Sequence, residues 1–187
     1  MHLSTEQHEL LECYKQMLLS WNAIHSLSGA KDSQSIQKNI DNSLFPLKKI
    51  DLSQKHLILD IGSGNGFPAI PLHIALRIPT ILCEPNAKKV AFLQNIKATL
   101  GLQNLSIQRK KIESLKLETL PDCITSRATF NVAILLEKCK HCIKNETTIL
   151  LYKGSNVDNE IPKGLKHTRF AHALLQYLVI NGKEVLC

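Results

Sequence analysis

The chain has 187 residues, which is enough for one well-packed domain with a short extension and too short for two full domains. Its 23 Lys and Arg residues against 16 Asp and Glu residues give a formal charge of +7, which favours a polyanionic partner such as nucleic acid. The N-terminus lacks the pattern of a signal peptide, and no apolar run approaches the roughly 20 residues of a membrane span, so we expect a cytoplasmic protein with no membrane contact.

Two amphipathic helices are predicted at the start of the chain. Apolar side chains recur every three or four positions over residues 4–21, where Ser4 and Gln7 can form a capping box. A second helix is predicted over residues 32–47, with Asp32 as its N-cap. We expect residues 1–50 to form a helical extension of an α/β core over residues 51–187, the two together making a single domain.

From residue 56 onward, short apolar runs alternate with helical stretches. Strands are predicted over residues 56–61, 79–84, 105–108, 123–125 and 147–152, and helices over residues 68–76, 87–100 and 131–143. Residues 167–170 and 177–180 are candidate final strands, and Asn181-Gly182 is an alternative turn for a terminal hairpin. This alternation predicts an α/β fold with a doubly wound, mostly parallel, Rossmann-like sheet and right-handed crossovers.

Six cysteines are spread through apolar surroundings, without the dense spacing of a secreted disulfide scaffold. We expect reduced thiols that are mostly buried, at Cys13, Cys83, Cys123, Cys139, Cys142 and Cys187. Cys139 and Cys142 have the spacing of a metal or redox motif. Because no second pair lies at zinc-site spacing and the motif falls inside a predicted helix, we expect no metal.

The first predicted strand runs into a glycine loop that begins at Asp60 and contains Gly62, Gly64 and Gly66. Ligands of open α/β sheets lie outside the carboxyl ends of the strands, where glycines let the backbone approach them closely. The dinucleotide fingerprint would place its third glycine at Phe67, and the Asp60 carboxylate would repel a pyrophosphate. A carboxylate attracts the ammonium and sulfonium groups of S-adenosylmethionine (AdoMet), so the loop predicts an AdoMet cofactor.

Glu84 lies 24 positions after Asp60, at the end of the next predicted strand. An acidic residue there can bind the hydroxyls of a ribose, which both NAD and AdoMet contain. Glu84 therefore indicates a nucleoside cofactor without choosing between them. For both carboxylates the competing interpretation is helix capping at a strand-to-helix turn.

The glycine loop and its continuation Phe67-Pro68-Ala69-Ile70-Pro71 resemble the signature of the RsmG (GidB) family, bacterial enzymes that methylate guanine N7 in 16S, the small-subunit ribosomal RNA. Four further segments resemble the same family: Trp21-Asn22 with Leu27-Ser28, residues 87–93, Ser126-Arg127-Ala128 and Tyr152-Lys153-Gly154. Together they extend from about residue 21 to residue 154.

The resemblance implies a role for each matching position. AdoMet would be held by the loop and by the ribose acid, at Asp60, Gly62, Ser63, Gly64, Gly66, Phe67 and Glu84. Lys111, Ile112 and Glu113 would lie beside the adenine, and Arg127 would border the methyl donor. Arg127 and Lys153 are the candidates for catalytic contacts, and Lys153 would contact RNA phosphate or substrate, with a salt bridge as the alternative.

Guanine N7 has an exposed lone pair and no proton to lose, so the reaction requires no general base and depends on the placement of N7 against the methyl group. Phosphates could be bound from eight basic positions: Lys88, Lys89, Arg109, Lys110, Lys111, Lys138, Lys140 and Lys144. Phe67 is also a candidate for contact with the target base. We expect a monomer that acts on small-subunit ribosomal RNA.

The chain departs from the family pattern in several places: only Ser43 matches cleanly in the segment over residues 38–43, and the segment after Gly154 is shorter. Asn39 stands where the family has histidine, Asn42 where it has aspartate, and Ala69 where it has glycine. The two asparagines motivate an alternative in which the chain is a non-catalytic RNA-binding or ribosome-binding module with a methyltransferase fold. An NAD-dependent oxidoreductase is the third hypothesis.

Overall fold

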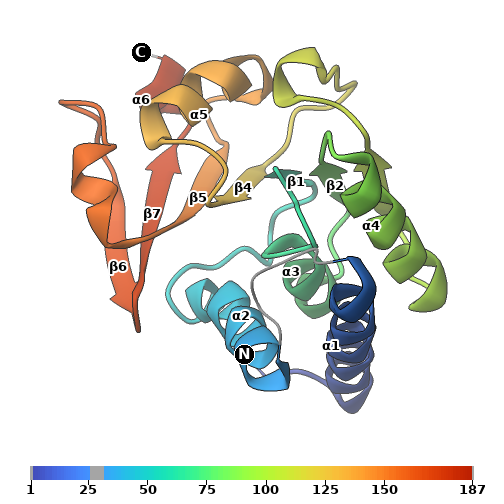
Figure 1. The fold of residues 1–187 in the computed structure, drawn as a ribbon. Helices are drawn as coiled ribbons and strands as arrows, with labels where there is room; N and C mark the ends of the chain where they lie inside the picture. Colours follow the sequence, from blue (N-terminus) through green and yellow to red (C-terminus); the bar gives the residue numbers. More distant parts are fainter. Residues whose placement is uncertain (1, 26–31, 187) are drawn as a thin grey trace.

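A seven-stranded sheet forms the centre of the molecule (Figure 1). The computed structural model describes residues 2–25 and 32–186, so Leu27, Ser28 and Cys187 lie outside the described residues. Along the sheet the strand order is β3-β2-β1-β4-β5-β7-β6. The strands are β1 Ile58–Ile61, β2 Thr80–Cys83, β3 Leu105–Gln108, β4 Cys123–Arg127, β5 Thr148–Lys153, β6 Thr168–His172 and β7 Leu175–Asn181.

The first five strands pair in parallel, and β7 pairs antiparallel with both β5 and β6. The strand order reverses between β1 and β4, which is where open α/β sheets bind their ligands. The predicted α/β class and mostly parallel sheet are confirmed. The two candidate final strands are also confirmed.

Helices cover both faces of the sheet (Figure 1). One face is covered by α1 Thr5–His25, α2 Ser33–Leu44, α3 Ala69–Leu76 and α4 Ala87–Thr99, whose apolar side chains form one core with Leu82 and Leu105. The other face is covered by α5 Val132–Cys139 and α6 Lys183–Leu186, together with the 3-10 helices η2 Ile112–Ser114, η3 Lys140–Cys142 and η4 Ser155–Asn159. A further 3-10 helix, η1 Phe45–Lys48, follows α2.

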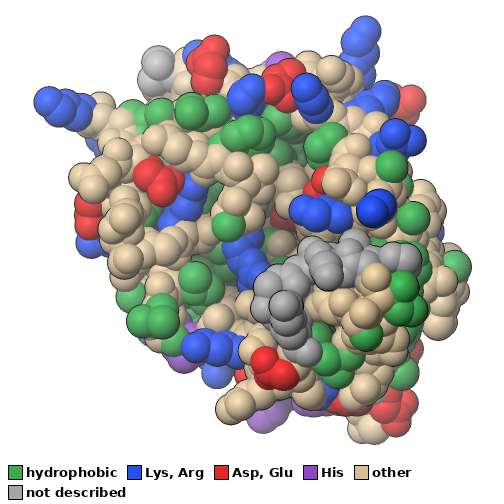
Figure 2. All heavy atoms as spheres, in the orientation of Figure 1, with side chains coloured by type: hydrophobic (Ala, Val, Ile, Leu, Met, Phe, Trp, Pro, Cys, Tyr) green, Lys and Arg blue, Asp and Glu red, His purple; other side chains and the backbone are tan. Residues whose placement is uncertain are grey.

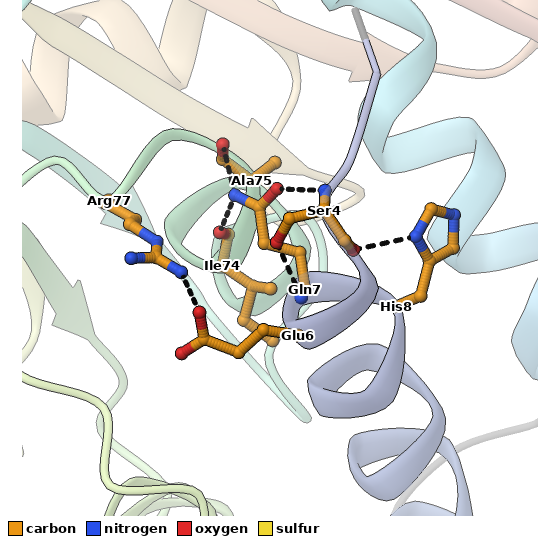
Figure 3. A network of polar contacts seen from close by, with 7 residues as sticks. All are labelled: Ser4, Glu6, Gln7, His8, Ile74, Ala75 and Arg77. Atoms are coloured by element: carbon orange, nitrogen blue, oxygen red, sulfur yellow. Dashed lines mark hydrogen bonds and ion pairs between the residues drawn. The ribbon is translucent and has the colours of Figure 1, made fainter.

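Helix α1 is held against the neighbouring helices and the glycine loop by large buried side chains and by polar contacts at its start. Tyr14 and Leu18 are fully buried, and burial of such a side chain contributes about 1.5–3 kcal/mol. Figure 3 shows Gln7 bridging two helix ends: its Oε1 accepts from the Ser4 backbone, and its Nε2 donates to the Ile74 and Ala75 carbonyls. These carbonyls belong to the last turn of α3, so α1 satisfies acceptors that the helix itself leaves free.

Most predicted elements differ from the structure by one or two residues at their ends, and the first helix extends to His25 rather than residue 21. Three further differences have a local cause. The second helix ends at Leu44 rather than residue 47, because Pro46 has no amide donor for a further α-helical hydrogen bond and the chain continues as the 3-10 helix η1 from Phe45. The helix predicted over residues 131–143 divides into α5 and η3. The terminal hairpin at Asn181-Gly182 is wrong, because β6 and β7 meet at Ala173 and the chain enters α6 after Gly182. Gly182 is needed for close approach instead, since an added Cβ would lie 2.0 Å from the Lys144 carbonyl oxygen.

Most cysteines are buried, as predicted. Cys83, Cys123, Cys139 and Cys142 lie in the core, whereas Cys13 is exposed on α1. Burial raises the pKa of the Cys139 thiol to about 12 and that of Cys142 to about 11, so both remain protonated at neutral pH. No helix within the described residues is long and apolar enough to cross a membrane.

Candidate functional site

The loop after β1 owes its shape to glycines. Gly62, Gly64 and Gly66 have φ angles of 71°, 59° and 101°, in the left-handed region that other residues avoid. An added Cβ at Gly62 would lie 2.3 Å from Thr129 Oγ1, and one at Gly66 would lie 2.6 Å from Ile70 Cγ1. The loop is therefore packed closely against the segment after β4 and against α3.

Asp60 lies in β1 between Leu82 of β2 and Thr125 of β4, and only 1% of it is exposed. Its Oδ1 accepts a hydrogen bond from Thr125 Oγ1 at 2.6 Å, whereas its buried Oδ2 has no hydrogen-bond partner among the described residues. Burial raises the pKa of the Asp60 carboxyl to about 7, although hydrogen bonds from Thr125 and Ser63 and the charge of Arg127 oppose the rise. An unpartnered carboxylate oxygen beneath the loop fits a nearby cationic ligand group.

Glu84 follows β2 and ties the loop to the next turn. Its Oε2 accepts from the Gly64 amide at 2.8 Å, and its Oε1 accepts from the Asn86 amide at 2.9 Å. The N-cap of α4 is Asn86, whose side chain accepts from the Lys88 and Lys89 amides, and that of α3 is Pro68. Neither Glu84 nor Asp60 is the cap of the helix that follows it.

Two cavities open on the carboxyl-end side of the strands. The smaller cavity has a volume of about 260 Å³ and is lined by Ile61, Gly62, Cys83, Pro85, Lys110, Lys111, Ile112, Glu113, Thr129, Phe130 and Lys138. The predicted adenine-side residues Lys111, Ile112 and Glu113 are therefore together in one wall. Ile112 is buried, and Glu113 forms an ion pair with Lys138, which also lies over the Phe130 ring.

The larger cavity has a volume of about 590 Å³ and adjoins the smaller one at Thr129 and Phe130. It is lined by Asn39, Asn42, Arg127, Ala128, Thr129, Phe130, Asn131, Tyr152, Lys153, Gly154, Glu160 and Leu175. The two positions that depart from the family pattern, Asn39 and Asn42, both lie in this wall. Asp60 and Glu84 are buried and line neither cavity.

Arg127, at the end of β4, connects the larger cavity to the loop. Its guanidinium carbon lies 4.9 Å from the centroid of the Phe67 ring, and its Nη1 donates to Asn39 Oδ1 at 3.3 Å. Burial lowers the pKa of Arg127, while the tyrosine hydroxyls and Asp60 near it favour its charged form. Phe67 is buried, and its ring forms a cation–π contact with the guanidinium.

Tyr14 is a residue of this site that the sequence pattern marks only as core. Its hydroxyl donates to the Asn65 carbonyl in the glycine loop at 2.7 Å, and its ring meets the edge of Phe67 with 5.4 Å between centroids. Helix α1 thus braces the loop at Tyr14 and the end of α3 at Gln7. Any apolar residue at position 14 would fit the helical periodicity of α1. The sequence pattern therefore does not predict that the Tyr14 hydroxyl binds the glycine loop.

Lys153 ends β5 and is 7% exposed. Its ammonium donates to the Phe130 carbonyl and forms a salt bridge with Glu160 Oε2 at 2.7 Å. The salt-bridge alternative for Lys153 is therefore present in the structure. Glu160, which follows η4, is a second cavity residue that sequence reasoning missed, because a lone glutamate in an irregular segment carries no signal.

The basic positions named from the sequence lie at different ends of the molecule. Lys110, Lys111 and Lys138 line the smaller cavity, whereas Lys144 pairs with Asp122 at 2.6 Å. Both members of that pair precede their strands, so Lys144 lies at the edge of the sheet opposite the cavities. Figure 2 shows Lys and Arg side chains around a hollow near the middle of one face. Across the described parts of the chain, no cluster of three or more His, Cys, Asp or Glu residues could hold a metal ion.

Comparison with known proteins agrees with this geometry. A family model described as rRNA small subunit methyltransferase G matches residues 7–184. The ribosomal RNA small subunit methyltransferase G of Helicobacter bizzozeronii is 46% identical over 153 residues, which are 81% of this chain and 84% of that protein. The protein of the same name from Wolinella succinogenes is 42% identical over 175 residues, which are 93% of this chain and 89% of that protein.

A solved structure shows the same fold at low sequence identity. The rRNA methyltransferase aviRa from Streptomyces viridochromogenes has a TM-score of 0.61 and is 11% identical, over 80% of this chain and 86% of that one. At this identity the likeness concerns the fold alone.

Proposed function

The chain belongs to the rRNA small subunit methyltransferase G family, and on that premise we propose that it transfers a methyl group from AdoMet to N7 of a guanine in 16S rRNA. The main support for AdoMet as the cofactor is Asp60, a buried carboxylate whose Oδ2 has no hydrogen-bond partner among the described residues. Such a group is unfavourable in an empty protein and favourable beside a cation. AdoMet supplies an electrophilic methyl group on a cationic sulfur.

The two cavities suit the two reactants. We assign the nucleoside part of AdoMet to the smaller cavity, with Ile112 as an apolar wall and Glu84 near the ribose, and the target base to the larger cavity. Thr129 and Phe130 line both, so the methyl group would pass beside them. Arg127, held by Phe67 and Asn39, borders this junction and would orient the base. Because N7 loses no proton, orientation and exclusion of water supply the catalysis.

The two alternatives are less well supported by the same residues. In a dinucleotide site the ionised Asp60 would face a pyrophosphate, and Phe67 would have to be glycine, yet its buried ring carries Arg127. The non-catalytic alternative is motivated by Asn39, which replaces the family's histidine. In the structure Asn39 Oδ1 accepts a hydrogen bond from Arg127, so this residue still contacts the proposed active-site arginine. The asparagine therefore keeps an acceptor for the guanidinium.

The test is methylation of small ribosomal subunits purified from a strain that lacks the gene. Purified protein with radiolabelled AdoMet should label the 16S rRNA, and borohydride and aniline treatment should then cleave the RNA at one new 7-methylguanosine. Calorimetry should show binding of AdoMet and not of NAD. Identical cleavage patterns from strains with and without the gene would refute the guanine-N7 assignment.

A further inference from the structure

We propose that Glu160 binds the Watson–Crick edge of the target guanine in the larger cavity and stabilises the positive charge that the base gains during methyl transfer. This inference rests on the proposed function and assigns a residue to it. In this arrangement Lys153 is a positioning residue that orients Glu160, in place of the phosphate contact expected from the sequence.

The charge distribution of the larger cavity is the first observation. Its described lining residues include two cations, Arg127 and Lys153, and Glu160 is the only carboxylate among them. A reaction that places positive charge on the base would be opposed by the two cations alone. Glu160 is therefore the one lining group that can offset that charge.

The geometry of the Lys153–Glu160 pair is the second observation. Lys153 is held by the Phe130 carbonyl, and it binds only Oε2 of Glu160. No hydrogen bond from the described residues occupies Glu160 Oε1, and the side chain retains 28% exposure in the cavity wall. One carboxylate oxygen is thus anchored by a nearly buried ammonium, and the other is free to accept a hydrogen bond from a ligand.

The hydrogen-bonding pattern of guanine fits this free acceptor. Guanine presents two donor groups, N1–H and the 2-amino group, on the edge opposite N7, whereas adenine presents an acceptor at N1. An ionised carboxylate only accepts hydrogen bonds, so it can bind both adjacent donors of guanine, whereas in adenine the N1 lone pair would face it unfavourably and only the 6-amino group could donate. Enzymes that modify bases commonly turn the base out of its stack into a pocket and bind its Watson–Crick edge, and a cavity of about 590 Å³ has room for one base.

The charge balance of the reaction gives Glu160 a second role. The N7 lone pair forms the new C–N bond, the pair of the broken C–S bond goes to sulfur, and no proton leaves. The positive charge therefore moves from the sulfur to the base. Because the charge on the base raises the acidity of N1–H, its hydrogen bond to the carboxylate strengthens in the transition state, which accelerates the reaction.

The experiment compares Glu160→Gln with Asp158→Asn, a matched control in the same segment whose carboxylate pairs with Arg169 and is 70% exposed. With small subunits from the gene-deletion strain, Glu160→Gln should lower kcat about 10- to 100-fold, which corresponds to loss of a charged hydrogen bond. The AdoMet dissociation constant should change by less than about twofold, and Asp158→Asn should match the wild type. A kcat for Glu160→Gln within about threefold of the wild type would overturn the proposal.

A substrate change tests direct contact. Subunits reconstituted with inosine at the target position lack only the 2-amino group. Inosine should slow the wild type about 10-fold. It should slow Glu160→Gln much less, because the variant has already lost the carboxylate that accepts from the 2-amino group. Equal slowing of both proteins would overturn the contact.

If Glu160→Gln fails to bind AdoMet, Glu160→Asp, which keeps the charge, replaces it in the same test. A wild type that labels no guanine in the subunit would overturn the proposed function as well, whereas an active wild type with an unaffected variant would overturn the role of Glu160 alone.

Discussion

Replacing Asp60 with Asn should stabilise the cofactor-free protein and weaken AdoMet binding, because a buried, half-partnered carboxylate is unfavourable until a cation approaches. Burial raises the pKa of Asp60 from its ordinary value of 3.8 to about 7. The folded protein then binds the Asp60 proton more tightly than the unfolded chain does. At low pH the neutral Asp60 carboxyl does not destabilise the fold. As the pH rises from about 4 to about 7, this stability is lost, because the carboxyl ionises more easily in the unfolded chain, and above about pH 7 the full destabilisation is present.

The size of the effect follows from the shift. About three pKa units correspond to about 4 kcal/mol of destabilisation at pH 8. The Asn side chain removes this penalty and keeps the acceptor for Thr125 Oγ1, but its amide nitrogen would replace the unpartnered Oδ2 and cost about 1–3 kcal/mol. The net gain is about 2 kcal/mol near pH 8, or about 4–8 °C in Tm, and it should fall to nearly zero near pH 5.

The opposite effect is expected on binding. Removing a unit charge about 6 Å from a cation, at an effective dielectric constant of about 20 to 40, should weaken AdoMet about 10- to 100-fold. Because the neutral form lacks this attraction and binds as weakly as the variant, wild-type affinity should rise about 4- to 12-fold between pH 5.5 and pH 7, and that of Asp60→Asn should stay nearly constant. Thermal unfolding and calorimetry over this pH range measure both effects. Equal affinities, or a Tm of the variant below that of the wild type at pH 8, would refute the role assigned to Asp60.

Three further substitutions test the supports of the loop. Tyr14→Phe removes the hydrogen bond to the Asn65 carbonyl and should weaken AdoMet about 3- to 10-fold, whereas Tyr177→Phe, which loses a comparable buried bond to the Asn42 carbonyl, should leave AdoMet affinity unchanged by calorimetry. Gly62→Ala should abolish AdoMet binding and lower the urea midpoint, and adding Thr129→Ala should recover part of the stability because the added Cβ meets the Thr129 side chain. Gln7→Ala leaves the Ile74 and Ala75 carbonyls without this donor and should destabilise the fold by about 1–3 kcal/mol, with little change in methyl transfer by the folded fraction.

The features that the sequence predicts well are those with a local cause. Alternating apolar runs and helical stretches indicate a parallel sheet, and a parallel sheet brings the ends of its strands to one edge. For this reason Lys111, Ile112, Glu113 and Arg127, which are far from the glycine loop in the sequence, lie around it in the structure. Asp60 could be singled out because its charge differs from what a pyrophosphate site requires.

The features that the sequence did not indicate depend on contacts between distant segments. Tyr14 and Asn65 are 51 positions apart, and Arg127 and Asn39 are 88 apart, so no local pattern relates them. Asn39 departs from the family pattern, yet its side-chain oxygen accepts a hydrogen bond from the Arg127 guanidinium. The sequence around Gly182 is typical of a hairpin turn, but in the structure this position lies against the Lys144 carbonyl and leaves no room for a Cβ atom. That contact exists only in the folded chain.

In the proposed reaction, Asp60 and Glu160 would stabilise the positive charge at two successive positions, first on the sulfur of AdoMet and then on the guanine base. Asp60 is buried in β1 just before the glycine loop, and Glu160 lies in the wall of the larger cavity, which meets the smaller one at Thr129 and Phe130. If the cation passes from sulfur to base, attraction by Asp60 stabilises the bound reactant, and attraction by Glu160 stabilises the transition state. The two carboxylates should therefore separate kinetically: Asp60→Asn should change chiefly AdoMet affinity, and Glu160→Gln chiefly kcat. Single-turnover rates at saturating AdoMet distinguish the two, and a lower saturated rate for Asp60→Asn than for Glu160→Gln would contradict this division.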